Sequence, residues 1–458
     1  MQLSKSVSLI TTFMLCSSSV WGYGTSKSQA AHDAKLLGQD TPTVANDLQL
    51  DDTDLNTSSM MQEEVSYSAE EPEEVDGFFE EIKFRGKIGI IYNGNSSDEY
   101  SDNSAIEGYS EFSKSFDSGT LTTNIALLYD FDDSNRRYFI LNELYYKIRS
   151  DNSTWSFGRS IKNWGVMEAY SISDVFNTKN YLSDSFDMSS KLGALSAEYT
   201  YRTEDAKFSM IAKLEEVEQN YPGQDNLYNY RINPYDGRLK TEKSRHRPTV
   251  YLTYDDSYYG DIQVDYSLIL QNGYDNKRYF TLDPTNTLDQ NAYLVNKVLG
   301  YTTITSDNSI YKFEMAYTDV ISDPTMSDYM HMGLGIEYLP TELFKGSEVR
   351  LLLEYYRYDY FDDSKLKNQD LSEMFDNDIF GGVQSTFGDS GTSDIKAGIL
   401  YDINNQEKTF ILTFGTRMKQ NYRLSMEWFV LSPGKETETA IGQIGQVNQV
   451  TFRANYFF

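Results

Sequence analysis

The chain ends in Val450-Thr-Phe-Arg-Ala-Asn-Tyr-Phe-Phe458, nine residues in which apolar and polar side chains alternate. In an extended strand, Phe452, Tyr456 and Phe458 share one face, while Arg453 and Asn455 lie on the other. One apolar and one polar face are typical of a membrane-spanning barrel strand, which contacts lipid on one side and water on the other. The pattern predicts that such a strand reaches the end of the chain. The last strand of a soluble β-domain is the alternative.

This ending, with Phe458 last and the aromatic Tyr456 two places before it, resembles the C-terminal signature of Gram-negative outer-membrane proteins. The resemblance implies that the barrel-assembly machinery reads the final strand. It also implies that the protein is located in the cell outer membrane of a Gram-negative bacterium.

The first 22 residues have the layout of a secretory signal peptide. Lys5 precedes an apolar stretch from Val7 to Leu15, and Val20-Trp-Gly22 offers a cleavage site. Cys16 follows Leu15, where a lipoprotein signal needs a small residue, so we assign it to the removed peptide. The mature chain then has no cysteine, which excludes disulfides and cysteine-ligated metals or haem.

Residues 23–79 are predicted to form a disordered acidic tail in the periplasm. Between Asp40 and Glu81 there are 14 acidic residues and no Lys or Arg, and large apolar residues are few. Such a segment cannot bury enough apolar surface to offset the entropy of ordering. The tail is either solvated or contacts a partner, and it carries much of the formal net charge of -29.

After the signal peptide, no stretch of about 18 apolar residues is available for a transmembrane helix. A closed barrel still crosses a membrane, and its alternating strands look hydrophilic on average. The mean hydropathy of -0.55 is therefore compatible with a membrane protein. The 37 Tyr and 25 Phe, with only 9 Pro, suit aromatic girdles and strands with few breaks.

Residues 80–458 are predicted to form an all-β, antiparallel, up-and-down transmembrane barrel. Short turns alternate with mostly longer loops. The turns are 117–120, 150–153, 203–205, 256–260, 306–308, 340–346, 388–391 and 419–421. The loops are 93–104, 131–136, 160–190, 218–247, 273–292, 322–327, 361–378, 403–406 and 432–446. Together they predict about 18 strands, with 16 as the alternative, and place both barrel ends on the periplasmic side. Either number leaves a water-filled lumen.

The polar faces of the strands predict two opposed charged walls in the lumen. The basic wall, on the first and last three strands, consists of Lys83, Arg85, Lys87, Arg417, Arg423 and Arg453. The acidic wall, about half a circumference away, consists of Asp255, Asp261 and Asp265. Opposed charges create a transverse field that favours anionic or zwitterionic solutes. Alternatively, the bases pair with neighbouring acids and only hold the barrel together.

One long loop contains Gly158-Arg159, Trp164-Gly165 and Asp174-Val-Phe-Asn177. This arrangement resembles large Gram-negative porin-like barrels, including alginate-export-type channels, although Thr178 stands where those proteins often have proline. The resemblance implies that the loop narrows the pore, with Arg159, Lys162, Trp164 and Asp174 as candidate constriction residues. By parity Arg159 shares a face with Trp155 and Phe157, so a lumen position requires a bulge or the end of strand pairing.

A second loop, which we call the basic loop, carries Arg231, Arg238, Lys240, Lys243, Arg245 and Arg247. It is either a funnel for anions or acidic sugars, or a rim that neutralises lipopolysaccharide phosphates. The aspartate clusters at 130–133 and 359–363 lack the glycine and closing glutamate of an EF-hand. Divalent cations bridging to lipopolysaccharide are one interpretation of these clusters. No other cofactor or metal and no nucleic-acid partner are expected.

These observations favour a porin for passive diffusion of small hydrophilic solutes. An exporter of acidic polysaccharide is the first alternative, and an outer-membrane receptor, scaffold or barrel hydrolase is the second. We do not expect an enzyme, because the three histidines (His32, His246 and His331) occur outside any catalytic motif. The solute and the choice between monomer and trimer stay open.

Overall fold

The computed structural model describes residues 82–96, 101–182, 190–223, 226, 235–260, 262–340, 347–362, 364–365, 375–388, 392–419, 421–435 and 439–458. The predicted signal peptide and acidic tail lie outside these residues. Among the described residues, no helix is long and apolar enough to cross a membrane.

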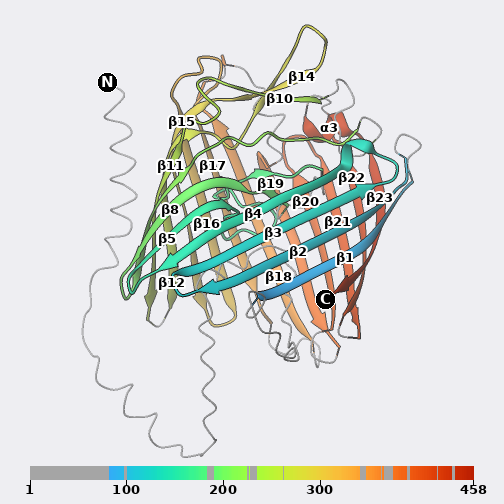
Figure 1. Cartoon of the computed structure of the whole chain (residues 1–458). Helices are drawn as coiled ribbons and strands as arrows, with labels where there is room; N and C mark the ends of the chain where they lie inside the picture. The colour runs from blue at the N-terminus through green and yellow to red at the C-terminus, as the bar shows by residue number, and fades with distance from the viewer. Residues whose placement is uncertain are drawn as a thin grey trace, which may run out of the picture. The chain divides into compact units, whose positions relative to one another are not determined.

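Eighteen antiparallel strands form one closed sheet (Figure 1). They are β1 (Ile82–Asn95), β2 (Asn103–Phe116), β3 (Gly119–Asp130), β4 (Arg137–Arg149), β5 (Ser153–Ser160), β8 (Ala194–Arg202), β9 (Ala206–Lys213), β11 (Thr249–Tyr259), β12 (Gln263–Tyr274), β15 (Leu294–Ser306), β16 (Ser309–Val320), β17 (Tyr329–Tyr338), β18 (Glu348–Tyr360), β19 (Asn377–Phe387), β20 (Ser393–Asp402), β21 (Lys408–Met418), β22 (Tyr422–Ser432) and β23 (Val447–Phe457). The predicted barrel of 18 strands is thereby confirmed. The predicted turns and loops mark the junctions between consecutive strands, but their bounds differ: residues 256–259 of the predicted turn 256–260 belong to β11.

The barrel closes where β23 pairs with β1. The register matches Lys87 with Phe457 and Ile91 with Arg453. Beyond the last ladder pair, the backbones of Gly86 and Phe458 exchange two hydrogen bonds of 2.9 and 3.0 Å. A Cβ atom at Gly86 would lie 2.6 Å from the ring of Phe458, so a larger residue there would displace the ring from this position.

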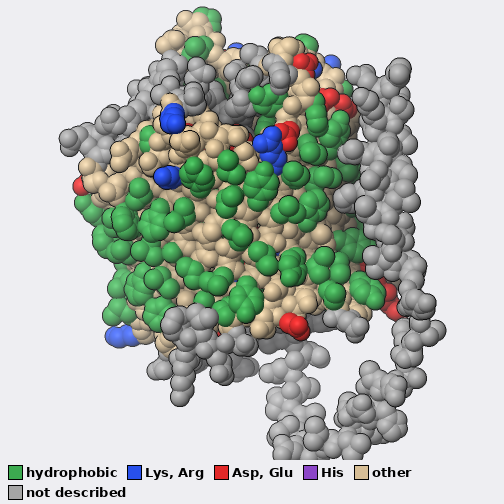
Figure 2. Space-filling view, turned by 180° about the vertical axis from the view of Figure 1, so that it is seen from behind, with side chains coloured by type: hydrophobic (Ala, Val, Ile, Leu, Met, Phe, Trp, Pro, Cys, Tyr) green, Lys and Arg blue, Asp and Glu red, His purple; other side chains and the backbone are tan. Residues whose placement is uncertain are grey.

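Side chains alternate between the lumen and the outer surface. Phe84, Ile88 and Ile90 of β1 are exposed on the outside, whereas Gly89 and Ile91 are buried within. Figure 2 shows hydrophobic side chains spread over one face of the wall, with charged side chains mainly toward its two ends. This is the distribution of a lipid-facing surface.

The remaining elements lie in the long loops. They are η1 (Ser134–Arg136), β6 (Thr178–Lys179), β7 (Lys191–Leu192), β10 (Tyr235–Thr241), β13 (Tyr279–Leu282), β14 (Leu288–Ala292) and α3 (Ala440–Ile444). Strands β10, β14 and β13 form a separate small sheet, and β6 pairs with β7. Figure 1 shows β10, β14 and α3 at the same rim of the barrel, opposite the short turns.

Candidate functional site

The basic wall lies on the inward faces of the strands on either side of the closing seam. Lys83 and Arg85 are exposed, and the side chains of Lys87 and Arg453 keep 27% and 26% of their surface accessible although they point inward. Arg417 and Arg423 stand directly opposite each other in register. Accessible side chains inside a barrel indicate that the lumen next to the seam is open to water.

Several of these bases have carboxylate partners on the same wall. Lys87 lies 3.5 Å from Glu107, and Arg453 lies 3.9 Å from Glu427. Arg423 donates to Asp394 at 2.7 Å. The pairs reduce the positive field of the wall, and they support part of the alternative interpretation in which the bases stabilise the barrel.

The acidic wall is also engaged with its neighbours. Asp255 lies 3.2 Å from the ammonium of Lys207. Asp265 accepts hydrogen bonds from Ser257 at 2.6 Å and from Gln263 at 3.0 Å. Asp261 lies outside the described residues.

Residues 161–182 and 190–193, which we call the constriction loop, lie between β5 and β8 and reach across the lumen to the opposite wall. Their described apolar side chains pack in one buried cluster with Ala194 of β8, with Phe375 just before β19, and with inward-facing residues of β9, β11, β12, β15, β16 and β18 to β20. Its members are Met167, Ile172, Val175, Phe176, Ala194, Ile211, Tyr251, Ile269, Leu299, Ala316, Leu352, Tyr356, Phe375, Phe380 and Leu400. The loop therefore covers this side of the lumen and leaves the seam side, with the basic wall, as the open part.

A buried glutamate of β16 holds the first half of the constriction loop. Glu314 accepts the backbone amides of Val166 and Met167 at 2.5 and 2.8 Å, and the amide of Ser173 at 2.8 Å. Carboxylates accept such bonds about twice as strongly as neutral groups do. One side chain thus fixes both ends of a turn in the loop.

A second glutamate, on β18, holds the next residues. Glu354 accepts the amides of Glu168 and Ala169 at 2.7 and 3.0 Å. The carboxylate of Glu168 in turn bonds to Lys312 at 2.9 Å. Strand β18 is the thirteenth of the barrel and β5 is the fifth. The loop is therefore attached nearly opposite the point at which it enters the lumen.

The predicted constriction residues occupy different environments. Lys162 points to the inner wall and pairs with Glu198, while Trp164 packs edge-on against Phe176 and Tyr251 at 5.7 and 5.3 Å. Asp174 pairs with Lys191, and burial raises its pKa against the effect of that ammonium. Trp164 and Asp174 thus support the loop from within.

Arg159 lies on the outward parity, in register with Leu144 and Leu195. Its guanidinium donates to the carbonyl of Gly193 at 2.5 Å and to Glu215. Strand pairing does end near Arg159. Its two bonds connect the end of β5 to Gly193, just before β8, and to Glu215, just after β9. Its side chain is not on the lumen face.

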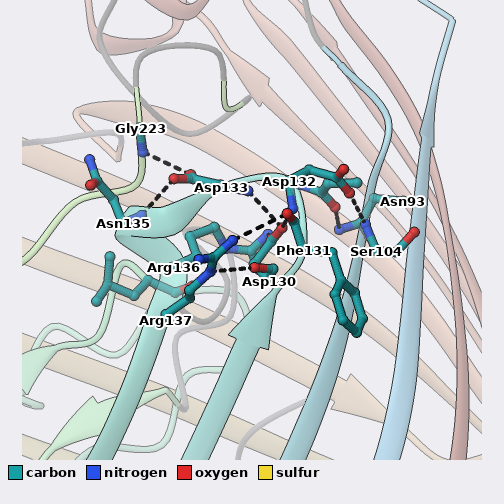
Figure 3. A network of polar contacts seen from close by, with 12 residues as sticks. Asn93, Ser104, Asp130, Phe131, Asp132, Asp133, Asn135, Arg136, Arg137 and Gly223 are labelled. Carbon is teal, nitrogen blue, oxygen red and sulfur yellow. Dashed lines mark hydrogen bonds and ion pairs between the residues drawn. The ribbon is translucent and has the colours of Figure 1, made fainter.

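The aspartates at 130–133 form a folded loop with their own backbone (Figure 3). Asp130 accepts the amides of Asp132 and Asp133 at 2.9 and 3.0 Å and pairs with Arg136 at 2.9 Å. Arg136 also donates to the carbonyl of Leu182 in the constriction loop at 2.9 Å. These carboxylates are engaged by the protein's own donors. Moreover, the described residues contain no group of three or more potential ligands placed for a metal ion.

The second aspartate cluster is engaged in a similar way. Asp359 bonds bidentately with Arg357, and Asp362 accepts the amide of Ser364 at 3.0 Å. Asp363 lies outside the described residues. The described carboxylates of both clusters are therefore engaged by donors of the protein itself.

Part of the basic loop is held by hydrogen bonds and an ion pair to other segments of the chain. Arg245 donates to the carbonyl of Glu216 at 2.9 Å, and Arg247 donates to Asn272 at 3.3 Å. Lys240 pairs with Asp289 at 2.5 Å. Arg238 and Lys243 are exposed, and Arg231 lies outside the described residues.

A buried carboxyl at the rim holds the segment that carries α3. Glu407 accepts a hydrogen bond from Thr439, the N-cap of α3, whose Ile441 and Ile444 pack on Phe429. Burial, with smaller contributions from neighbouring aspartates, raises the pKa of Glu407 to about 7. This docked rim segment is therefore sensitive to pH.

The anchors Glu314 and Glu354 were not among the residues singled out from the sequence. Their inward parity on β16 and β18 was the available signal, because a buried acid needs hydrogen-bond donors. The donors include backbone amides that lie 147 and 186 positions away in the chain. No side-chain pattern marks those amides.

No protein-family model matches the sequence. No curated protein matches it either. Among solved structures, the barrel is similar to Pseudomonas aeruginosa OccK3 (OpdO), with 9% identity over 83% of this chain and 96% of that one and a TM-score of 0.51. Acinetobacter baumannii OccAB4 is 9% identical over 82% of this chain and 97% of that one, with a TM-score of 0.51. The P. aeruginosa outer membrane protein opdK is 9% identical over 83% of this chain and 100% of that one, with a TM-score of 0.50. At such low identity the likeness shows the fold alone, a closed antiparallel β-barrel like those of these outer-membrane proteins.

Proposed function

We propose that this chain is an outer-membrane porin through which small hydrophilic solutes diffuse passively along the seam side of the lumen. The observation that carries the proposal is the accessibility of inward-facing Lys87 and Arg453 beside the seam, while the described part of the constriction loop packs on the other side. A packed barrel would bury such side chains, as this barrel buries Lys297 and Lys312.

We further propose that the open passage favours anionic or zwitterionic solutes. The basic wall has six bases, of which Lys87, Arg423 and Arg453 pair with Glu107, Asp394 and Glu427. The concentration of these six bases on the strands that border the passage is the support for a positive field there. In a narrow channel with low-dielectric walls such a field raises the local concentration of anions. Glu107, Asp394 and Glu427 on the same wall offer negative charges to solutes that carry both signs.

The constriction loop favours small solutes over an exported polysaccharide. Glu314 and Glu354 attach it across the lumen, so a polymer would have to pass beside a fixed obstruction. Catalysis at His331 is not part of the proposal, because this side chain is buried, stacks on Tyr170 and bonds to the carbonyl of Phe375 at 3.0 Å.

Swelling of liposomes that contain the purified full-length protein tests this function. We expect swelling in small sugars, amino acids and carboxylates, with rates that fall steeply as solute size increases. Monocarboxylates and amino acids should enter faster than amines of equal size. Absence of swelling with every solute would contradict the porin, and equal rates for amines and carboxylates would contradict only its preference.

A further inference from the structure

The outer surface of the barrel carries a carboxylate within a cluster of aromatic rings. In β11, Leu252 and Tyr258 are 48% and 62% exposed on the membrane side, and Asp256 shares their parity. Asp255 lies on the opposite face and pairs with inward-facing Lys207. Asp256 is thus directed toward the lipid, close to the short turn after β11.

The donors to the Asp256 carboxylate among the described residues are neutral. Its Oδ2 accepts the hydroxyls of Tyr254 and Tyr266 at 2.6 and 2.8 Å, and its Oδ1 accepts the amide of Ser257 at 2.8 Å. Among the described residues, no Lys, Arg or His reaches Asp256 within ion-pair distance. By contrast, the outward-facing Asp359 is neutralised by its bidentate pair with Arg357.

Aromatic rings surround this charge, and one flank is open. The ring of Tyr254 lies 4.9 Å from Phe208 and 6.0 Å from Tyr266. On the β9 side the cross-strand partner of Asp256 is Ala206, whose methyl group covers little of the carboxylate. Oδ1 retains one lone pair for a further donor.

A fixed negative charge at the edge of the hydrocarbon region is costly without a counter-charge. An ammonium with N–H donors satisfies both needs, because it pairs with Oδ1 and its charge is attracted to the faces of the tyrosine rings. A quaternary ammonium offers no N–H group, and an anionic headgroup is repelled. The short-turn side faces the periplasmic leaflet, which consists of glycerophospholipids.

We propose that Asp256, with Tyr254, Tyr266 and Phe208, forms a surface site for the primary ammonium of a phosphatidylethanolamine headgroup. The site is independent of the solute that the pore conducts. It would select one phospholipid class for the lipid shell at this part of the barrel.

Native mass spectrometry of the full-length protein tests the site, after exchange into an equimolar mixture of phosphatidylethanolamine, phosphatidylcholine and phosphatidylglycerol. We expect the wild type to retain phosphatidylethanolamine preferentially, and Asp256→Asn to reduce that retention by roughly threefold to tenfold. Asp359→Asn is the matched control, because it removes an outward carboxylate that already has a cation, and it should leave retention unchanged.

A second variant keeps the test independent of folding defects in Asp256→Asn. Ala206→Leu fills the open flank and leaves the carboxylate in place, so it should also abolish the preference. Equal retention of the ethanolamine and choline lipids by the wild type would overturn the proposal. The proposal would also be overturned if Asp256→Asn and Ala206→Leu both retained phosphatidylethanolamine as well as the wild type does.

Discussion

Replacing Glu314 by alanine should release the constriction loop. The variant leaves the amides of Val166, Met167 and Ser173 without their acceptor. A buried amide without a partner costs about 1–3 kcal/mol. Three such amides give a range of roughly 3–9 kcal/mol, and water entering from the lumen would place the cost in the lower part, about 3–5 kcal/mol.

A loss of about 3 kcal/mol changes the ratio of attached to detached loop by a factor of roughly one hundred or more. Glu354 still holds the next two amides, so we expect fluctuation of the loop without its complete release. In single-channel recordings, Glu314→Ala should switch frequently between the wild-type level and a larger conductance. Glu314→Gln should switch less often than Glu314→Ala and more often than the wild type. The reason is that its amide oxygen still accepts the amides of Val166 and Met167.

Glu107→Ala is the matched control for this experiment. It also removes one inward-facing carboxylate, but that carboxylate pairs with Lys87 and is remote from the loop. The control should change ion selectivity slightly and leave the current steady. If Glu314→Ala shows the steady wild-type conductance while its barrel remains folded by heat-modified gel mobility, the assigned role of this glutamate is wrong.

Three further results are expected. Arg136→Gln removes the hydrogen bond to Leu182 of the constriction loop and should increase current noise. Arg137→Gln, which removes a bond to Asp130 and leaves that to Leu182, should not. Equal noise from both variants would contradict the role of Arg136 in holding the constriction loop. Gly86→Leu should destabilise barrel closure by about 1–3 kcal/mol because of overlap with Phe458, and unchanged unfolding in urea would disagree. The folded-state pKa of Glu407, about 7, exceeds its ordinary 4.5, so docking of the α3 segment is strongest below about pH 4.5 and weakens as pH rises through 7. The protection factor of the α3 amides, taken relative to intrinsic exchange at each pH, should fall over that range in the wild type and stay constant in Glu407→Gln.

The sequence was sufficient for the barrel because local signals define its strands. Period-two alternation assigns each face, and turn residues such as those at 117–120 and 150–153 separate the strands. The final strand required only its own alternation up to Phe458. Closure against β1 then followed from the topology of a barrel.

The interior of the lumen was less predictable, because its contacts join residues far apart in the chain. Parity gave the inward direction of Lys87 and Arg453, but not whether Glu107 and Glu427 lie close enough to pair. It also gave the outward parity of Arg159, although not its bond with Glu215. The attachment of the constriction loop depends on backbone amides, which carry no sequence signal.

The central claim is that an open, water-filled passage runs beside the basic wall. The most direct test is the reversal potential of the full-length protein in a planar bilayer under a potassium chloride gradient. We predict a steady conductance with anion preference, which Lys83→Gln, Arg85→Gln and Lys87→Gln together shift toward cations. A protein that conducts no current would contradict the open passage, and a reversal potential unchanged by the triple substitution would contradict the role of the basic wall.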